Sequence, residues 1–333
     1  MGLSVMGRVY DEYHCGMEKL ADWVIKHNKI GLPVSAAVML FFACLVPVNE
    51  INDEATKYFD TSTEFRQSVD KQEETISGMS SISWGLYSGE ENGINNPEFV
   101  KVISGFSDWL RAQPETDHVM TISDTIKRLN KSMNGDNEDY YRLPEERELT
   151  AQYLLMYEMS LPYGLDLNNQ LNIDKSSTRV VSTLKNLGSK EYVAMEQRAI
   201  DWFATNAPQV RMTASSPTLM FSHIGETNMD SMIISMIAAM FLISILLIFA
   251  LRSFRLGLIS LIPNIGPAAF GFGIWALISG EINLGLSIVG SMTLGIIVDD
   301  TVHLLSKYQR ARNDGRNAEE GIRYAFSSVG REM

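Results

Sequence analysis

The stretch Gly295-Ile-Ile-Val-Asp-Asp-Thr-Val-His303 places two adjacent aspartates, Asp299 and Asp300, inside a long apolar segment. The preceding residues 282–298 are uncharged, and the first basic residue after the pair is Lys307. An ionisable side chain at membrane depth costs about 2.5–3.5 kcal/mol on insertion scales. A chain that places two such residues side by side is expected to use them, and the pattern predicts an intramembrane pathway for protons or ions.

Four segments of the chain are long enough to cross a bilayer, which takes about 20 mostly apolar residues. We expect membrane spans at residues 30–48, 229–251, 255–280 and 282–306, and the acid pair lies in the last one. Pro263 and Pro267 in the third span are expected to kink it. Residues 1–29 then form an N-terminal cytoplasmic segment. Residues 307–333 form a cytoplasmic amphipathic segment that the end of the chain truncates.

Basic residues near the ends of the spans predict the orientation of the protein, because positive loops stay in the cytoplasm. These residues are Lys26 and Lys29 before the first span, Arg252 and Arg255 between the second and third, and Lys307 after the fourth. The long segment 49–228 then lies on the opposite side of the membrane. In a bacterium the chain is therefore a multi-pass protein of the inner (plasma) membrane with a large periplasmic domain.

The segment between the first two spans has the composition of a water-soluble acidic domain. Residues 48–228 contain 28 acidic and 16 basic residues, which accounts for the whole net charge of −12. An acidic domain is not expected to bind nucleic acid, which needs a basic surface. The hydrophobic periodicity predicts strands at 81–87, 118–122, 179–184 and 209–213, and helices at 97–112, 123–133, 145–160 and 189–205. Strand–helix–strand units of this kind predict a small ferredoxin-like α/β sandwich.

The fourth span carries its polar and small residues on one side. Successive residues of a helix turn by about 100°, so Ser291, Gly295, Asp299 and His303, each four apart, share a face. Ser291 and Gly295 are small enough for a neighbouring helix to pack closely. Asp300 points about 100° away from this face. His303 is expected either to relay protons or offer a counter-charge to the acids, or to be hydrated near the cytoplasmic surface.

Two neighbouring carboxyls in a poor dielectric do not both ionise readily, so Asp299 and Asp300 should titrate as a coupled pair. Such a pair can load a proton from one side and release it to the other. Asp299 and His303 are also spaced as possible metal ligands, but two ligands are too few for a closed site. The chain has no phosphate-binding Gly-x-x-x-x-Gly-Lys-Ser/Thr loop. We therefore expect no enzymatic activity, no metal and no cofactor.

The motif and its surroundings resemble the resistance–nodulation–division (RND) superfamily, whose members carry a Gly-x-x-x-Asp-Asp pattern in this position. Residues 301–308 and 325–330 resemble the family's flanking segments. The resemblance is strongest to the lipid-exporting branch, the mycobacterial-membrane-protein-large and hopanoid-exporter-like permeases, and the segment 300–308 resembles a C-terminal half. It implies a membrane α-helical bundle with four spans of a six-span repeat and an inserted periplasmic α/β porter domain of ferredoxin-like type.

The resemblance also implies a function, the export of lipids or other hydrophobic molecules driven by the proton-motive force, with Asp299 and Asp300 as the proton relay. Asp300 stands where many lipid exporters have tyrosine, so its role is the less defined. The expected partners are a lipid or hydrophobic substrate, protons, membrane lipids, and the missing other half of the transporter or a second copy of the chain. Two alternatives remain, a sterol- or lipid-sensing membrane module that does not transport and an accessory subunit of protein export.

Overall fold

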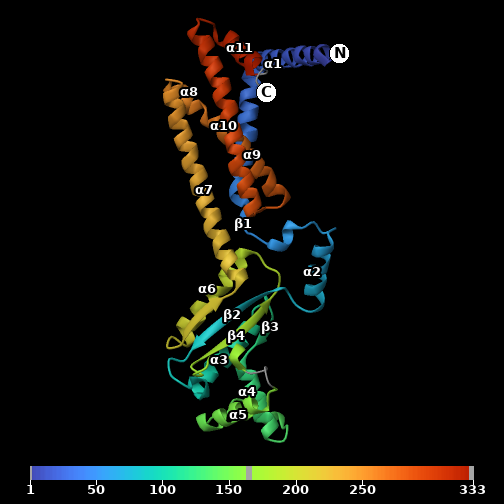
Figure 1. The fold of residues 1–333 in the computed structure, drawn as a ribbon. Helices are drawn as coiled ribbons and strands as arrows, with labels where there is room; N and C mark the ends of the chain where they lie inside the picture. The colour runs from blue at the N-terminus through green and yellow to red at the C-terminus, as the bar shows by residue number, and fades with distance from the viewer. Residues whose placement is uncertain (1, 163–166, 330–333) are drawn as a thin grey trace. The chain divides into compact units, whose positions relative to one another are not determined.

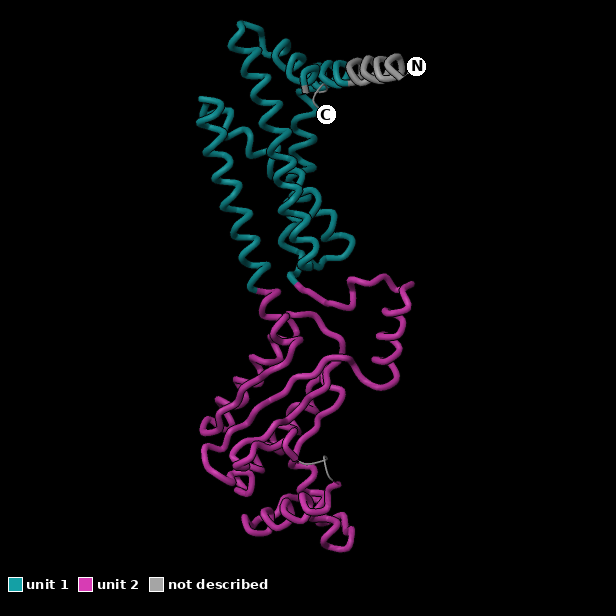
Figure 2. Tube along the Cα trace, viewed as in Figure 1, with its two compact units in different colours: residues 1–51, 227–333 teal, residues 52–226 magenta. Residues whose placement is uncertain are grey.

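The computed structural model describes residues 2–162 and 167–329, with the backbone alone for residues 2–16 and 329. The chain divides into two compact units, which Figure 2 shows in different colours. One unit combines Met1–Ile51 with Thr227–Met333, and the other is Asn52–Glu226. The boundary at residues 226 and 227 falls inside the helix α7 (Pro217–Ala250).

The first unit is helical, and four helical segments in the described part of the chain are long and apolar enough to cross a membrane. They are Met17–Val48, Pro217–Ala250, Phe254–Ile278 and Leu284–Asn313. The predicted number of spans is confirmed by the length and composition of these helices. The helices of this unit (Figure 1) are α1 (Gly2–Leu45), η1 (Val46–Val48), α7, α8 (Phe254–Ile259), α9 (Leu261–Ile278), α10 (Leu284–Asn313) and α11 (Ala318–Val329). A short parallel pair joins β1 (Glu50–Ile51) to β6 (Glu281–Ile282).

The third span is interrupted at Ser260, between α8 and α9, and not at either of its prolines. Pro263 explains this position, because a proline has no N–H and its ring clashes with the carbonyl four residues earlier, here that of Ile259. Pro267 lies inside α9 without ending it. The predicted kink at Pro263 and Pro267 is thus displaced by one turn toward the N-terminus.

Two glycines of α9 let this helix approach α1 closely. A Cβ on Gly266 would lie 2.2 Å from Met39 Cε, and a Cβ on Gly273 would lie 2.4 Å from the carbonyl oxygen of Phe42. Small residues have this role in membrane helix packing, where close backbone contact replaces the hydrophobic driving force. The two glycines therefore fix α9 against the first span.

The second unit contains a four-stranded sheet with helices on one face. Its strands are β2 (Ser80–Tyr87), β3 (Thr116–Met120), β4 (Ser177–Leu184) and β5 (Arg211–Ser215), in the order β3-β4-β2-β5 with every neighbouring pair antiparallel. Its helices are η2 (Ala55–Tyr58), α2 (Glu64–Thr75), η3 (Gly93–Asn95), α3 (Pro97–Arg111), α4 (Ile122–Met133), η4 (Glu138–Tyr140), α5 (Arg147–Ser160), η5 (Leu167–Asn169) and α6 (Ser189–Asn206).

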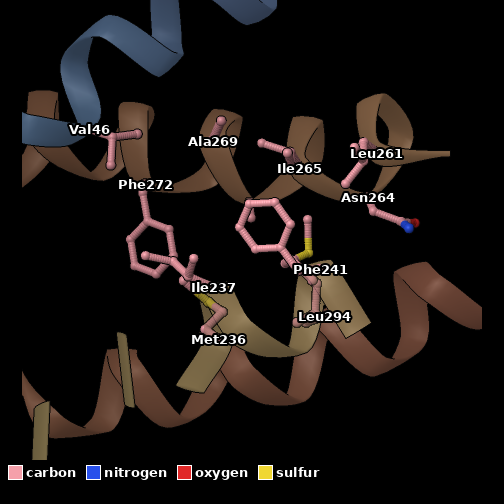
Figure 3. A pocket seen from close by; sticks show the side chains of 12 residues that line it. Val46, Met236, Ile237, Phe241, Leu261, Asn264, Ile265, Ala269, Phe272 and Leu294 are labelled. Carbon is pink, nitrogen blue, oxygen red and sulfur yellow. The ribbon is translucent and has the colours of Figure 1, made fainter. Parts of the chain in front are cut away.

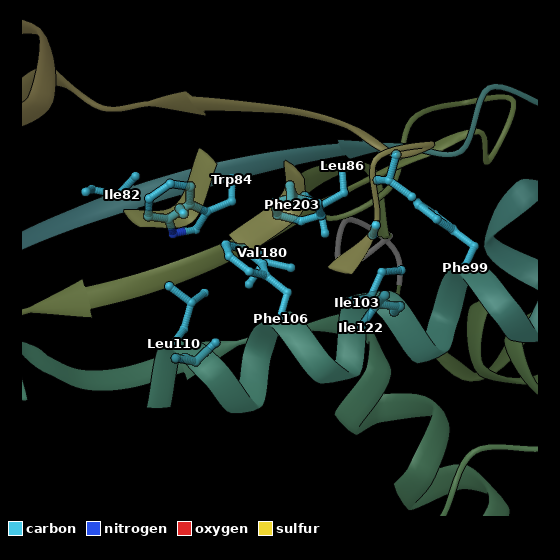
Figure 4. Close-up of a cluster of buried hydrophobic side chains, with 14 of the residues drawn as sticks. Ile82, Trp84, Leu86, Phe99, Ile103, Phe106, Leu110, Ile122, Val180 and Phe203 are labelled. Carbon is cyan, nitrogen blue, oxygen red and sulfur yellow. The ribbon is translucent and has the colours of Figure 1, made fainter. Parts of the chain in front are cut away.

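The core of this unit lies between the sheet and the helices α3 and α6 (Figure 4). Strand β2 alternates, and its Trp84 is completely buried. The Trp84 ring packs edge-on against Phe106 of α3, and Phe106 in turn lies 4.7 Å from Phe203 of α6 between ring centroids. The indole Nε1–H donates a hydrogen bond of 2.9 Å to Ser182 Oγ on the neighbouring strand. One face of the sheet therefore carries a well-packed aromatic core.

Helix α6 is capped by a residue far away in the sequence. Its N-cap residue is Gly188, which has no side chain to offer. Instead Asn52 Oδ1 accepts a hydrogen bond of 3.2 Å from Lys190 N, while Asn52 Nδ2 donates to Glu191 Oε2 at 3.1 Å. A Cβ on Gly188 would lie 2.1 Å from Asn52 Oδ1, so the glycine makes room for the cap. This contact fixes the start of the second unit to one of its main helices.

Candidate functional site

Helix α10 carries the predicted site residues along an uninterrupted length of 30 residues. Asn283 starts the helix, because its Oδ1 accepts a hydrogen bond of 2.9 Å from Leu286 N. The helix packs through its buried residues Ser287, Leu294 and Thr301. The predicted site residues Ser291, Gly295, Asp299, Asp300 and His303 are all exposed. The polar side of α10 is therefore the side that the described residues leave uncovered.

The structure brings Asp299 and His303 together and leaves Asp300 apart. His303 Nε2 lies 3.4 Å from Asp299 Oδ1, one turn away on the same helix. The Asp299 side chain is 74% exposed and that of His303 is 47% exposed. The two side chains form an ion pair only when His303 is protonated. An acid and a base at this distance can exchange a proton directly or through one water molecule.

No described residue packs closely against Gly295 on this face. A Cβ on Gly295 would meet no described atom within 4 Å. The Ser291 hydroxyl donates to the carbonyl of Ser287 at 3.2 Å, inside its own helix. The close packing that we expected at Gly295 and Ser291 is thus not made by the described residues, and their packing role stays a prediction.

A cavity of about 430 Å³ lies between α7, α9 and α10, beside η1 (Figure 3). Eleven of its twelve lining residues are apolar, including Phe241 of α7, Phe272 of α9 and Leu294 of α10. Asn264 of α9 is the exception. It is 1% exposed, and its Oδ1 has no hydrogen-bond partner in the described part of the chain. The membrane unit therefore contains an apolar space, and the Asn264 amide beside it is buried with an unsatisfied acceptor.

Sequence patterns do not reveal this cavity, because its lining comes from four separate segments. One signal was present in the sequence. Asn264 is a polar residue within the apolar stretch Leu261-Ile-Pro-Asn-Ile-Gly266. Polar groups at membrane depth are costly and usually face the interior of a bundle, so an isolated amide in a span indicates a buried contact or a cavity.

A second space, of about 440 Å³, lies between α7 and α10 and has a more polar wall. Ser231 and Ser235 of α7 face it, together with Ser291 of α10. Ser291 is thus the predicted site residue that borders a cavity. Across residues 17–162 and 167–328, no group of three or more His, Cys, Asp or Glu side chains could hold a metal ion.

The model of the MMPL family matches residues 173–332, which include the acid pair and the last three candidate spans. This stretch, slightly less than half of the chain, is similar to the MMPL family. The match confirms the resemblance to RND-type permeases that the Gly-x-x-x-Asp-Asp motif predicted. The matched stretch also contains Asn264 and most of the apolar cavity, since α9 and α10 lie wholly within it.

The fold is similar to the cryo-EM structure of the hedgehog release protein Disp from water bear (Hypsibius dujardini). The similarity covers 98% of this chain and 44% of that chain, at 14% sequence identity and a TM-score of 0.47. The chain therefore spans less than half the length of this structure, and a likeness of this size does not indicate function. A comparison with curated proteins gives no match.

Proposed function

We propose that the chain is part of an exporter of lipids or other hydrophobic molecules across the bacterial inner membrane, driven by the proton-motive force. The observation that carries the proposal is the acid pair Asp299–Asp300 within α10, a helix apolar enough to cross a membrane and part of the stretch that is similar to the MMPL family. Ionisable residues in such helices are rare and mark ion or proton pathways. The proposal thus rests on the cost of placing two acids there.

The proposed proton step uses the geometry of Asp299 and His303. A proton from water on the outer side binds to a carboxylate oxygen of Asp299, which makes the side chain neutral. It then passes to His303 Nε2, 3.4 Å from Asp299 Oδ1, and leaves to water on the cytoplasmic side. Each cycle returns both side chains to their starting state.

Coupling to the substrate is proposed to run along α10 itself. Leu294 lies in the wall of the apolar cavity, and Asp299 follows five residues later on the same helix. Five residues correspond to about 7.5 Å along a helix axis. A helix moves as a rigid element, so a shift of α10 on protonation of Asp299 would change the shape of the cavity. The apolar lining supports a lipid or another hydrophobic molecule as the cargo.

The second unit is proposed to be a periplasmic porter-type domain of ferredoxin-like fold. Its strand order β3-β4-β2-β5, its antiparallel pairings, and the helices between β2 and β3 and between β4 and β5 support this assignment. The periplasmic location rests on the basic residues at the opposite ends of the spans. In this proposal the unit receives the substrate after it leaves the membrane.

A lipid-sensing module that does not transport is the second candidate, and the apolar cavity favours it as much as it favours an exporter. The two functions differ in their energy source. Collapse of the proton gradient with an ionophore stops an exporter but leaves lipid binding by a sensor unchanged. Continued lipid export in the absence of a gradient would therefore exclude the proposed coupling.

Substitution of Asp299 by asparagine tests the relay. Asp299→Asn keeps the size and polarity of the side chain but cannot take up a proton, so lipid appearance at the cell surface should fall at least tenfold. Asp314→Asn is the matched control, because Asp314 follows the last residue of α10 and is exposed. Equal membrane levels of the two variants must be verified by immunoblot. Unchanged export in Asp299→Asn would refute the relay.

A further inference from the structure

The sheet of the second unit carries a polar groove of about 600 Å³ on the face opposite its aromatic core. Ser81, Ser83, Gly85 and Tyr87 of β2 line it, because they alternate along the strand with residues that are buried in the core. Residues of β4 and β5 and the segment 168–172 complete the wall. The groove therefore lies wholly within the second unit.

Gly85 forms the floor of this groove. It pairs with Arg179 on β4 and with Thr213 on β5, and residues paired in this way project from the same face of a sheet. Neighbouring strands lie about 4.8 Å apart, so the backbones at Arg179 and Thr213 are about 10 Å apart across the glycine. A Cβ at position 85 would lie 2.9 Å from Thr213 Oγ1. The missing side chain therefore leaves a recess between an arginine and a hydroxyl.

The lining is positively charged although the domain around it is acidic. Of the sixteen described residues that line the groove, one is basic, Arg179, and none is acidic. A second cation, Arg211, lies at the edge, with its guanidinium carbon 5.4 Å from the centroid of the Tyr87 ring. Residues 48–228 as a whole contain 28 acidic and 16 basic residues. A groove with positive charge and no carboxylate, in such a domain, attracts an anion and repels a cation.

The rest of the wall consists mainly of uncharged hydrogen-bonding groups, contributed by five serines, two threonines, three asparagines, one glutamine and one tyrosine. An arginine binds phosphate through two parallel N–H···O bonds, while hydroxyls and amides pair with uncharged polar oxygens. The volume is within the range of small-molecule sites and leaves room for more than the phosphate itself. The lining therefore fits a phosphate ester with hydroxylated substituents.

We propose that this groove binds the phosphodiester of a polar lipid head group. Arg179 holds the phosphate in the recess above Gly85, and the hydroxyls of β2 and β5 pair with the uncharged oxygens of the head group. The requirement for an anion rests on the lining alone. The choice of a lipid as its source rests on the proposed export function, in which the second unit receives the substrate.

Soluble head groups test this inference without the acyl chains. Glycerophosphoglycerol has one phosphodiester between two glycerol units, and diglycerol has the same two units without phosphate. Binding of each to the full chain in a nonionic detergent is measured by isothermal titration calorimetry. Glycerophosphoglycerol should bind, and diglycerol should bind at least about tenfold more weakly, as expected for the loss of hydrogen bonds between charged groups. Equal binding of the two would overturn the inference.

Inorganic phosphate distinguishes a lipid head group from free phosphate as the source of the anion. It should bind roughly fivefold more weakly than glycerophosphoglycerol, because it engages Arg179 but leaves at least one neutral hydrogen bond with the polar wall unmade. Binding of inorganic phosphate as tight as that of the ester would overturn the assignment to a phosphodiester.

Arg179→Gln should weaken the binding of glycerophosphoglycerol at least about tenfold, because glutamine can donate hydrogen bonds but carries no charge. Arg128→Gln is the matched control, since Arg128 is exposed on α4 of the same unit and lies outside the groove. It should bind the ester as the unaltered chain does. Equal affinity of the two variants would overturn the role of Arg179.

Gly85→Leu provides a second variant, because its side chain would fill the recess beside Arg179. It should lose the ester while its secondary structure, measured by circular dichroism, stays unchanged, and undiminished binding by the folded variant would overturn the location. Asp299→Asn should bind the ester as the unaltered chain does. A failed relay therefore leaves the groove standing, and a failed groove leaves the relay standing.

Discussion

Replacement of Ser182 by alanine should destabilise the second unit through one buried hydrogen bond. Ser182 and Trp84 are both completely buried, and the indole Nε1–H donates to Ser182 Oγ at 2.9 Å. Alanine removes the acceptor and leaves the N–H in the apolar core, away from water. A buried donor without an acceptor costs about 1–3 kcal/mol. The ratio of folded to unfolded protein should fall about 5- to 150-fold, since 1.4 kcal/mol is a factor of ten.

A double-mutant cycle separates the hydrogen bond from the packing of the ring. Trp84→Phe removes the donor and part of the ring volume, so it also costs stability through a cavity. In the double variant, Ser182→Ala should cost less than it does alone, because no N–H is left unsatisfied. The difference should be about 0.5–1.5 kcal/mol, the net value of one such bond. Two residues in direct contact are expected to show such a coupling.

Pulse proteolysis of the full chain in urea measures these differences, because a brief protease treatment cuts only unfolded domains. Ser83→Ala is the control, since Ser83 lies on β2 next to Trp84 but on the opposite face of the sheet. It should change the free energy of unfolding by no more than about 0.5 kcal/mol. Equal urea midpoints for Ser182→Ala and Ser83→Ala would refute the argument that the indole depends on Ser182.

Two further predictions concern helix packing and pH. Gly273→Val should lower the melting temperature of the chain in detergent, by an overpacking cost of about 1–3 kcal/mol, because its side chain would meet the Phe42 carbonyl. Gly271→Val, at a position with no described atom within 4 Å of a Cβ, should not, and equal melting temperatures would contradict the α1–α9 contact. Burial raises the pKa of the Tyr192 phenol above its ordinary value of 10.0, so the folded state holds this proton more tightly than the unfolded state. The contribution of this phenol to the free energy of unfolding is full below about pH 10, and it is lost as the pH rises through the pKa of Tyr192 in the folded state. Urea midpoints measured from about pH 8 to 11 should therefore fall less steeply in Tyr192→Phe, and parallel curves would argue against this assignment.

The elements that the sequence predicted well are those set by local patterns. The strand expected at 81–87 is β2 (Ser80–Tyr87), because Ile82, Trp84 and Leu86 alternate with polar residues. The helix expected at 97–112 is α3, which begins where expected because Asn96 Oδ1 accepts a hydrogen bond from Glu98 N. Both signals lie within a few residues of the element that they define, so they can be read without knowledge of the fold.

The less accurate predictions failed where local signals compete or are weak. The helix expected at 123–133 begins one residue earlier, as α4 (Ile122–Met133), because Thr121 caps it and its Oγ1 accepts a hydrogen bond from Ser123 N. Two hydroxyl residues so close together give equally good capping signals. Helix α2 was not predicted at all. Val69 is the buried residue among its twelve, so it has no apolar face for a pattern to detect.

The candidate site shows the same division between local and long-range information. Asp299 and His303 were expected on one face because their spacing of four residues fixes their relation in any helix, and their atoms lie 3.4 Å apart. The apolar cavity depends on side chains from α7, α9, α10 and η1. No property of a single helix determines how three spans and a short turn enclose a volume, so such a space can be found only in the structure.

Asn264 and Asp299 differ in how visible they are in the sequence, although one physical argument applies to both. Each is a polar side chain within an apolar span, and each costs free energy unless something satisfies it. The cost of a charge is large enough to make Asp299 conspicuous from the amino-acid sequence alone. A neutral amide can be paired by a neighbouring helix or a backbone carbonyl, so its presence alone is ambiguous. The structure removes this ambiguity for Asn264, because it shows the side chain buried and its Oδ1 without a donor among the described residues. A polar residue in a span can therefore be interpreted only when its hydrogen-bond partners are known. For Asn264, the described residues supply no donor to Oδ1.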